Sequence, residues 1–149
     1  MNLANAGIPV FVLDQDEKNL QRGMGVIEKN YQMMVDRGRM NQEQKEVVMQ
    51  LIKPTLSYDD LADVDIVVEA VYENLELKQE IFKTLDSVTK DTAILASNTS
   101  GLDVDALASV TDRPGKVVGT HFFSPANVMR LLEVVRGKHS SDETMATVM

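Results

Sequence analysis

A histidine and a glutamate in one short segment are the first candidates for chemistry in this sequence. His121, one of only two histidines, lies in GTHFFSPANVMRLLEVVRG, residues 119–137, and Glu133 lies in its apolar run LLEVV. A carboxylate that accepts one imidazole N–H fixes the tautomer of the ring and stabilises its cation, so the other nitrogen can act as a general base. The alternative is a core histidine bonded to backbone and a glutamate at a strand edge. The residue types alone leave both interpretations open.

The elements that must position this pair alternate between strands and helices. Short, nearly all-apolar runs predict strands over residues 8–13, 65–71, 93–97, 116–123 and 131–135. Apolar residues at helical spacing predict helices over 16–37, from Asn41 to just before Pro54, over 75–88, over 102–109, and from near Ser141 onward. Such alternation is typical of a parallel sheet covered on both faces. We therefore expect an α/β fold, Rossmann-like and doubly wound, with a mainly parallel sheet.

Polar residues follow the first predicted strand. In open α/β sheets, ligands bind outside the carboxyl ends of the strands. Asp14 ends the first strand and Gln15 follows it. A carboxylate at this place can accept two hydrogen bonds from the adenosine ribose of a dinucleotide, and no arginine follows to receive a 2′-phosphate, which favours NAD over NADP. The alternative is that Asp14 caps the following helix.

The second strand ends in Val71, Tyr72 and Glu73, and Lys78 lies early in the next helix. Lys78 could reach a phosphate or ribose of a ligand, although a solvated surface lysine is the commoner case. Glu69 lies within the predicted buried strand. Because burial of an unpaired carboxylate is costly, we expect Glu69 to find backbone or side-chain donors.

The third strand ends in a run of small polar residues, Ser97 to Gly101. The four small polar residues Ser97, Asn98, Thr99 and Ser100 offer donors and acceptors to a ligand. The alternative is a turn followed by a helix cap.

No glycine-rich phosphate loop stands in the sequence. A dinucleotide fold begins with a strand, a G-x-G-x-x-G turn and a helix. Gly23 and Gly25 lie within a helical pattern, follow no strand, and have Glu28 in place of the third glycine. MNLANAG at the start instead resembles the tail of a helix that ends at Gly7. Either the protein is not a dinucleotide-binding domain, or its first strand and glycine loop lie before Met1.

Composition excludes several other classes of function. The net charge of −8 argues against nucleic acid or an anionic membrane as the main partner. With no cysteine and two histidines in separate contexts, we expect no disulfide and no metal site. No apolar run is long enough to span a membrane, and no signal peptide is evident, so a cytoplasmic or organelle-matrix protein is expected.

Four motifs together resemble one family, the L-3-hydroxyacyl-CoA dehydrogenases of fatty-acid β-oxidation. They are ANAGIPVFVLD (4–14), DIVVEAVYENLELK (65–78), ASNTSGLDVDALA (96–108) and GTHFFSPANVMRLLEVVRG (119–137). Their form is most similar to the dehydrogenase part of multifunctional β-oxidation enzymes, the peroxisomal type included. The resemblance implies oxidation of the 3-hydroxyl of an L-3-hydroxyacyl-CoA to a ketone, with transfer of hydride to NAD.

The resemblance also implies roles for individual residues. His121 matches the general base, Glu133 its carboxylate partner, and Ser100 the serine that hydrogen-bonds the substrate oxygen near the nicotinamide. Lys78 and Ser100 are expected to contact the acyl-CoA substrate. Ser124 stands where many members have asparagine. The residues expected to bind the cofactor are Asp14, Gln15, Val71, Glu73, Lys78, Asn98, Ser100 and Ser124.

Against the family pattern, residues 1–149 are expected to be a partial NAD-binding domain without the C-terminal helical domain. We expect such a fragment to be weakly active or inactive alone. The alternatives are a non-catalytic module that binds dinucleotide or acyl-CoA, and an incomplete truncated product. Without its first strand the sheet would have an open edge, which favours a homodimer or pairing with another chain. The expected location is the bacterial cytoplasm or the peroxisomal or mitochondrial matrix.

Overall fold

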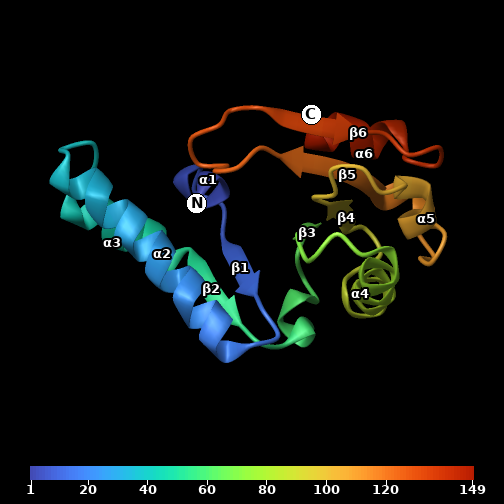
Figure 1. Cartoon of the computed structure of the whole chain (residues 1–149), viewed down its shortest axis with the longest axis horizontal. Coiled ribbons are helices and arrows are strands. Elements are labelled where there is room, and N and C mark those ends of the chain that lie inside the picture. Colours follow the sequence, from blue (N-terminus) through green and yellow to red (C-terminus); the bar gives the residue numbers. More distant parts are fainter. The chain divides into compact units, whose positions relative to one another are not determined.

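The chain forms two compact units in a computed structural model that describes all residues, 1–149. The first unit comprises Met1–Asp60 and the second Leu61–Met149. Figure 1 shows the elements of both units in the order of the sequence. None of the helices combines the length and the apolar character that a membrane span requires.

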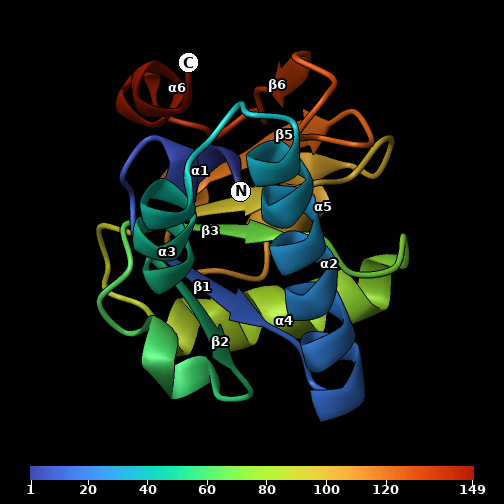
Figure 2. The same cartoon turned by 90° about the vertical axis from the view of Figure 1, so that its left-hand side faces the viewer.

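The first unit is a two-stranded parallel sheet with helices. Its elements are α1 (Asn2–Asn5), β1 (Val10–Leu13), α2 (Glu17–Asp36), α3 (Gln42–Gln50) and β2 (Ile52–Thr55). The ladder runs from Val10 opposite Ile52 to Leu13 opposite Thr55. The helices α2 and α3 lie side by side (Figure 2), and the apolar residues of α2, α3 and both strands pack around the fully buried Tyr31.

Local sequence signals set the ends of these helices. The Asp16 side chain accepts a hydrogen bond from the backbone N–H of Asn19 and caps α2. Asn41 and Gln44 form a reciprocal capping box at the start of α3. Gly7, with φ of +80°, follows α1 in the left-handed conformation that favours glycine. The helix starts at residues 16 and 41, and the helix tail before Gly7, are therefore confirmed.

The strand β2 corrects the sequence prediction. Helical spacing placed Leu51 and Ile52 in one helix with Val47 and Val48, but α3 ends at Gln50 and Ile52–Thr55 pairs with β1. That helix was expected to end just before Pro54, which instead lies within β2. Proline is tolerated on an edge strand, where its missing N–H interrupts no second ladder, and in a two-stranded sheet β2 is an edge strand.

The second unit is a four-stranded open sheet. Its regular elements are β3 (Ile66–Glu69), α4 (Leu75–Val88), β4 (Ile94–Ser97), α5 (Val104–Ala108), β5 (Val117–Phe122), β6 (Leu132–Val135) and α6 (Asp142–Val148), with a short 3₁₀ turn at Pro114–Lys116; another 3₁₀ turn, Tyr58–Leu61, lies where the first unit passes into the second. The strand order is β3-β4-β5-β6; β3, β4 and β5 are parallel, and β6 is antiparallel to β5. The mainly parallel α/β fold is confirmed. The strands are divided between two sheets, however, because no ladder joins β1 or β2 to β3.

Helices cover both faces of the second sheet. All residues of β4 are buried. Ile94, Ala96 and Val118 pack against Met145 and Val148 of α6. On α4, Phe82 is 0% exposed and Leu85 2% exposed, and full burial of such a side chain contributes roughly 1.5–3 kcal/mol. Burial on both faces therefore accounts for the apolar character of β4 and of the start of β5, and the strand ends remain the places where polar side chains can meet a ligand.

Candidate active site

The pair His121 and Glu133 is formed by two neighbouring strands. The antiparallel register of β5 and β6 places His121 directly opposite Glu133. Nδ1 of His121 lies 2.9 Å from Oε2 of Glu133. The prediction that the two strands lie side by side with these side chains in contact is confirmed. The alternative, a histidine bonded to backbone in the core, is wrong.

The geometry leaves one nitrogen of His121 available. A carboxylate only accepts hydrogen bonds, so Nδ1 carries the hydrogen that is donated to Glu133. No protein group hydrogen-bonds Nε2. The ring of Phe123 packs at a tilt against the imidazole with 5.0 Å between ring centroids. The His121 side chain is 23% exposed, so a ligand can reach it, and the arrangement can accept a proton at Nε2. The catalytic role stays a prediction.

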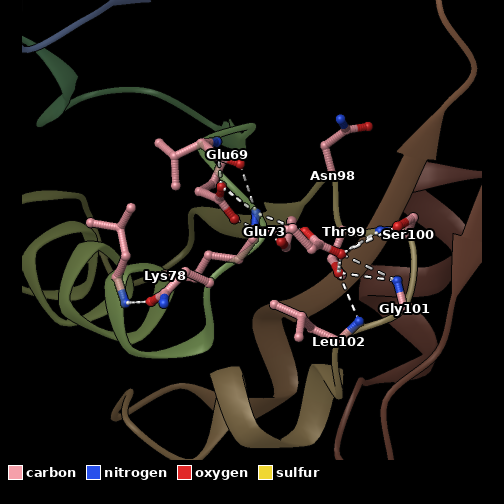
Figure 3. A network of polar contacts seen from close by, with 12 residues as sticks. Glu69, Glu73, Lys78, Asn98, Thr99, Ser100, Gly101 and Leu102 are labelled. Carbon is pink, nitrogen blue, oxygen red and sulfur yellow. Dashed lines mark hydrogen bonds and ion pairs between the residues drawn. The ribbon is translucent and has the colours of Figure 1, made fainter.

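A second polar cluster lies at the ends of β3 and β4 (Figure 3). Glu73 follows β3, and its Oε1 accepts hydrogen bonds from the backbone N–H of Ser100 at 2.9 Å and of Gly101 at 3.3 Å. The hydroxyl groups of Thr99 and Ser100 donate to the same oxygen, at 2.5 Å and 3.3 Å. The loop that follows β4 is therefore folded around a single carboxylate. We call Thr99 to Gly101 the Ser100 loop.

Thr99 and Ser97 were expected only as members of the polar run after the third strand, and the sequence assigned neither of them a role of its own. Thr99, 4% exposed, also accepts a hydrogen bond from the backbone N–H of Leu102 at 2.8 Å and thereby closes the turn. The alternative of a turn before a helix cap is therefore correct for the backbone, with Asp103 as the cap of α5. A threonine between other small polar residues carries no signal that would mark it as the residue that anchors them.

These contacts lower the pKa of Glu73. The hydrogen bond from Thr99 has the largest effect. Burial acts in the opposite direction, while the backbone of Ser100, the ammonium group of Lys78 and the backbone of Gly101 lower the pKa further. All of these donors favour the charged form of the carboxylate.

Acid is therefore expected to loosen the Ser100 loop. The folded-state pKa of Glu73 lies below its ordinary value of 4.5, so the stabilisation is fully present above that value and is lost as the pH falls through the lower folded-state pKa. An acid titration of the chain followed by NMR should move the amide resonances of Ser100 and Gly101 in one step. Glu73→Gln should abolish this step, and Glu76→Gln, at an exposed position on α4, should retain it. If the step persists in Glu73→Gln, protonation of Glu73 is not what moves these two amide resonances.

The predicted partners of Glu69 are present. Glu69, 4% exposed, accepts hydrogen bonds at Oε1 from the backbone N–H of Val71 at 2.6 Å and from Lys78 Nζ at 2.7 Å. Its Oε2 accepts from the hydroxyl of Ser97 at 2.7 Å. Lys78 is 0% exposed, so the interpretation as a solvated surface lysine is wrong. Its contacts with cofactor and substrate stay predictions.

Asn98 connects the two clusters. Its backbone N–H donates to the carbonyl of Glu69 at 2.7 Å, and its side-chain Oδ1 accepts from the backbone N–H of Phe122 at 2.8 Å. Phe122 follows His121 on β5. The residue that precedes the Ser100 loop is thereby fixed to the strand that carries the histidine, and the side-chain amide of Asn98 keeps its N–H donors for a ligand.

Asp14 and Gln15 belong to the first unit. Oδ1 of Asp14 accepts a hydrogen bond from the backbone N–H of Asp16 at 2.9 Å. The alternative that Asp14 caps the next helix is wrong, because Asp16 is the cap of α2. Oδ2 of Asp14 has no protein partner and Gln15 is exposed. The ribose contact stays a prediction.

Val71 and Ser124 are the remaining residues that were predicted to contact the cofactor. The backbone of Val71 is held by Glu69 and Lys78, and its side chain is 39% exposed at the end of β3. Ser124 is exposed in the segment between β5 and β6, before a cis peptide bond to Pro125. Neither the structure nor the residue type assigns a ligand to them.

Comparison with known proteins places these residues in a family context. Residues 1–149 match the family described as "3-hydroxyacyl-CoA dehydrogenase, NAD binding domain". The peroxisomal bifunctional enzyme of Danio rerio is 47% identical over 153 residues, which cover 100% of this chain and 20% of that protein. The fatty acid oxidation complex subunit alpha of Psychrobacter arcticus is 42% identical and covers 98% of this chain, again with 20% of the relative matched. The chain thus spans about a fifth of the length of these curated relatives.

Two solved structures have the same fold as this chain. The (S)-3-hydroxybutyryl-CoA dehydrogenase of Ralstonia eutropha matches with a TM-score of 0.94 at 36% identity over 97% of this chain and 51% of that chain. The dehydrogenase part of multifunctional enzyme 1 from C. elegans matches with a TM-score of 0.84 at 35% identity over 98% of this chain and 33% of that chain.

Proposed function

Because the chain belongs to the NAD-binding domain family of the 3-hydroxyacyl-CoA dehydrogenases, we propose that it serves the NAD-dependent oxidation of L-3-hydroxyacyl-CoA to 3-ketoacyl-CoA in fatty-acid β-oxidation. The relatives in which it matches a fifth of the length are named for fatty-acid oxidation or as a peroxisomal bifunctional enzyme. The activity proposed here is that of the whole protein, and the 149 residues contribute a part of its site.

The observation that carries the proposal is the hydrogen bond between His121 and Glu133. Oxidation of an alcohol removes the hydroxyl proton and, from the same carbon, a hydride. Nε2 of His121 accepts the proton, and the Glu133 carboxylate, 2.9 Å from Nδ1, stabilises the imidazolium that results. When NAD is bound, it supplies the hydride acceptor.

Ser100 is the residue proposed to hold the substrate oxygen. Its hydroxyl lies on an exposed loop whose backbone is fixed by Glu73. A hydroxyl so placed can hydrogen-bond the alcohol and the ketone alike, because it both donates and accepts. Its role is to orient the reacting oxygen toward the histidine rather than to move a proton.

The residues of this chain can supply some of the contacts that NAD requires. The unbonded Oδ2 of Asp14, followed by no arginine, suits an adenosine ribose with a free 2′-hydroxyl. The other residues proposed to contact the cofactor are Lys78 on α4 and, at strand ends or in the segment after β5, Gln15, Val71, Glu73, Asn98, Ser100 and Ser124. No G-x-G-x-x-G occurs among the 149 residues, so they do not supply the backbone N–H cradle of a pyrophosphate.

Partners and location follow from the same proposal. The acyl-CoA thioester is the substrate. Association of two copies, or of another strand with the open edge of the sheet, is supported by the strand order, in which β3 pairs only with β4 and leaves its other edge without a ladder. The names of the relatives, peroxisomal in Danio rerio and bacterial in Psychrobacter, favour a peroxisomal matrix or a bacterial cytoplasm.

An assay of NADH formation tests the proposal. The longest natural protein that contains these residues should form NADH from L-3-hydroxybutyryl-CoA and should leave the D enantiomer unchanged. A calorimetric titration of the 149-residue chain with NAD, run in parallel, measures how much binding these residues provide alone. Binding of NAD or acyl-CoA without turnover in the longer protein would contradict the oxidation and favour a binding module.

A further inference from the structure

Gly119 lies on β5 directly opposite Val135 of β6, and the next opposed pair on the same face of the sheet is His121 and Glu133. A Cβ atom at Gly119 would lie 2.9 Å from Cβ of Val135. Directly opposed side chains in antiparallel strands have Cβ atoms about 4.5–5.5 Å apart. The two strands are therefore closer together at this pair than a side chain on Gly119 would allow.

The core holds the other neighbours of Gly119 in place. The same Cβ would lie 3.2 Å from Cγ2 of Val104, a core residue of α5. On its other side β5 pairs with β4, where Gly119 is opposite Ser97, and the fully buried Ser97 donates a hydrogen bond to Glu69. Because α5 and β4 are fixed in the core, β6 is the neighbour that would have to give way to a side chain.

The strand β6 is an edge strand whose later end is tied to β5. In the strand order β3-β4-β5-β6, it forms a ladder only with β5. Beyond Val135, the backbone N–H of Gly137 donates to the hydroxyl of Ser140 at 2.9 Å, and that hydroxyl donates to a backbone carbonyl of β5 at 2.6 Å. The earlier end, which carries Glu133, follows the exposed segment 124–131. A push at Val135 therefore displaces the end of β6 that carries Glu133.

His121 does not follow such a displacement. Its strand β5 is paired on both sides, and the backbone N–H of Phe122 donates to Oδ1 of Asn98 at 2.8 Å. To bring the two opposed Cβ atoms to an ordinary separation, β6 would have to move by roughly 1.5 Å. Even half of this displacement at Glu133 would lengthen its 2.9 Å contact with Nδ1 of His121 to more than about 3.5 Å, beyond the range of a hydrogen bond.

We propose that Gly119 is a positioning residue for the acid–base pair: because it has no side chain, β6 lies close enough to β5 for Glu133 to reach Nδ1 of His121. In this role Gly119 acts through Glu133 rather than on an atom of the substrate. The proposal rests on the function proposed above, since the placement matters for the imidazolium that forms when Nε2 takes up the substrate proton.

Four variants test this placement. Gly119→Ala introduces the Cβ atom and should displace β6. Gly119→Ala/Val135→Gly removes the opposed Cβ and should restore Glu133, since the contact with Val104 then needs an adjustment of only a few tenths of an ångström. Gly119→Ala/Val135→Ala keeps the opposed Cβ and should not restore it. The matched control is Gly115→Ala, because a Cβ there would meet its nearest neighbours at 3.6 and 3.8 Å, which is ordinary contact.

The first measurement is NMR of the histidine rings in the 149-residue chain. In the wild type, His121 should show a slowly exchanging proton on Nδ1, because this proton is donated to Glu133, and the exposed His139 should show none. In Gly119→Ala the Nδ1 proton of His121 should exchange faster by roughly tenfold or more. The double variant with glycine at position 135 and the control should retain the wild-type signal.

The second measurement is the steady-state rate of NADH formation by the longest natural protein that contains these residues. Gly119→Ala should lower kcat by roughly tenfold to 10²-fold, because Glu133 then no longer stabilises the imidazolium. The KM for acyl-CoA should stay within about twofold of wild type. Gly119→Ala/Val135→Gly should return kcat to within about threefold of wild type, and Gly115→Ala should leave it unchanged.

Two results would overturn the proposal. A folded Gly119→Ala with an unaltered His121 signal, whatever its Tm or kcat, would show that Glu133 stays in place beside the added methyl group. Equal recovery by Val135→Ala and Val135→Gly would show that the opposed Cβ is not what displaces the strand.

If Gly119→Ala does not fold, Gly119→Ala/Val135→Gly decides the question. A folded double variant with the wild-type His121 signal supports the proposal, and a folded double variant without that signal contradicts it. The NMR measurement needs no turnover, so it tests the placement of Glu133 even if the wild-type protein fails the dehydrogenase assay.

Discussion

Replacement of His121 by glutamine is expected to lower kcat for NADH formation by roughly 10²- to 10⁴-fold, the usual contribution of a positioned general base. Glutamine offers an amide at the place of the imidazole but has no nitrogen that takes up a proton at neutral pH. The antiparallel pairing of β5 and β6 is made by backbone groups and stays intact. The Kd for NAD should therefore remain within about threefold of wild type.

The measurement is a steady-state assay of the longest natural protein with L-3-hydroxybutyryl-CoA. The chain offers a matched control in its other histidine, His139, which is exposed in the segment after β6. His139→Gln should have wild-type kcat. Full activity of His121→Gln would remove the histidine from the mechanism.

Replacement of Glu133 by glutamine is expected to lower kcat by roughly tenfold to 10²-fold. The side-chain carbonyl of glutamine can still accept the hydrogen bond from Nδ1, so the tautomer and the ring orientation are retained. What is lost is the negative charge that stabilises the imidazolium. The Glu133 side chain is 54% exposed, and solvent screening of its charge limits the expected loss.

The KM values for both substrates should stay within about twofold of wild type, because Glu133 is proposed to contact neither of them. Glu143→Gln is the matched control: this glutamate is 79% exposed and pairs with Lys116 at 3.2 Å in the same unit. A KM for acyl-CoA raised by tenfold or more, at unchanged kcat, would instead identify Glu133 as a substrate contact.

The sequence predicted most elements of the fold because its local signals agree with the tertiary structure. The runs at β4 and at the start of β5 are apolar because they are buried on both faces, and the caps Asp16 and Asn41 act within their own helices. The strand β2 was missed because Pro54 is compatible with a strand only at an edge, and whether a strand is an edge depends on a partner distant in the sequence. The division into two sheets likewise depends on pairing that no local pattern encodes.

The sequence predicted the contact between His121 and Glu133, but it predicted the hydrogen bonds around Glu73 only in part. His121 and Glu133 were found because an isolated charge in an apolar run and a rare histidine are conspicuous, and a short connection between strands brings them together. The network around Glu73 was found only in part. Whether Lys78 is solvated or buried depends on Glu69, nine positions away on another element, and residue type alone does not decide it. Thr99 gives no signal, since its role consists entirely of the hydrogen bonds it makes.

A double-mutant cycle of His121→Gln and Glu133→Gln, measured as kcat for NADH formation, tests most directly the claim that the two residues work as one acid–base pair. If Glu133 acts through the imidazole, adding Glu133→Gln to His121→Gln should lower kcat by less than about threefold further. If the double variant instead loses activity by the product of the two single losses, the residues act independently, and the acid–base pair proposed for this chain is contradicted.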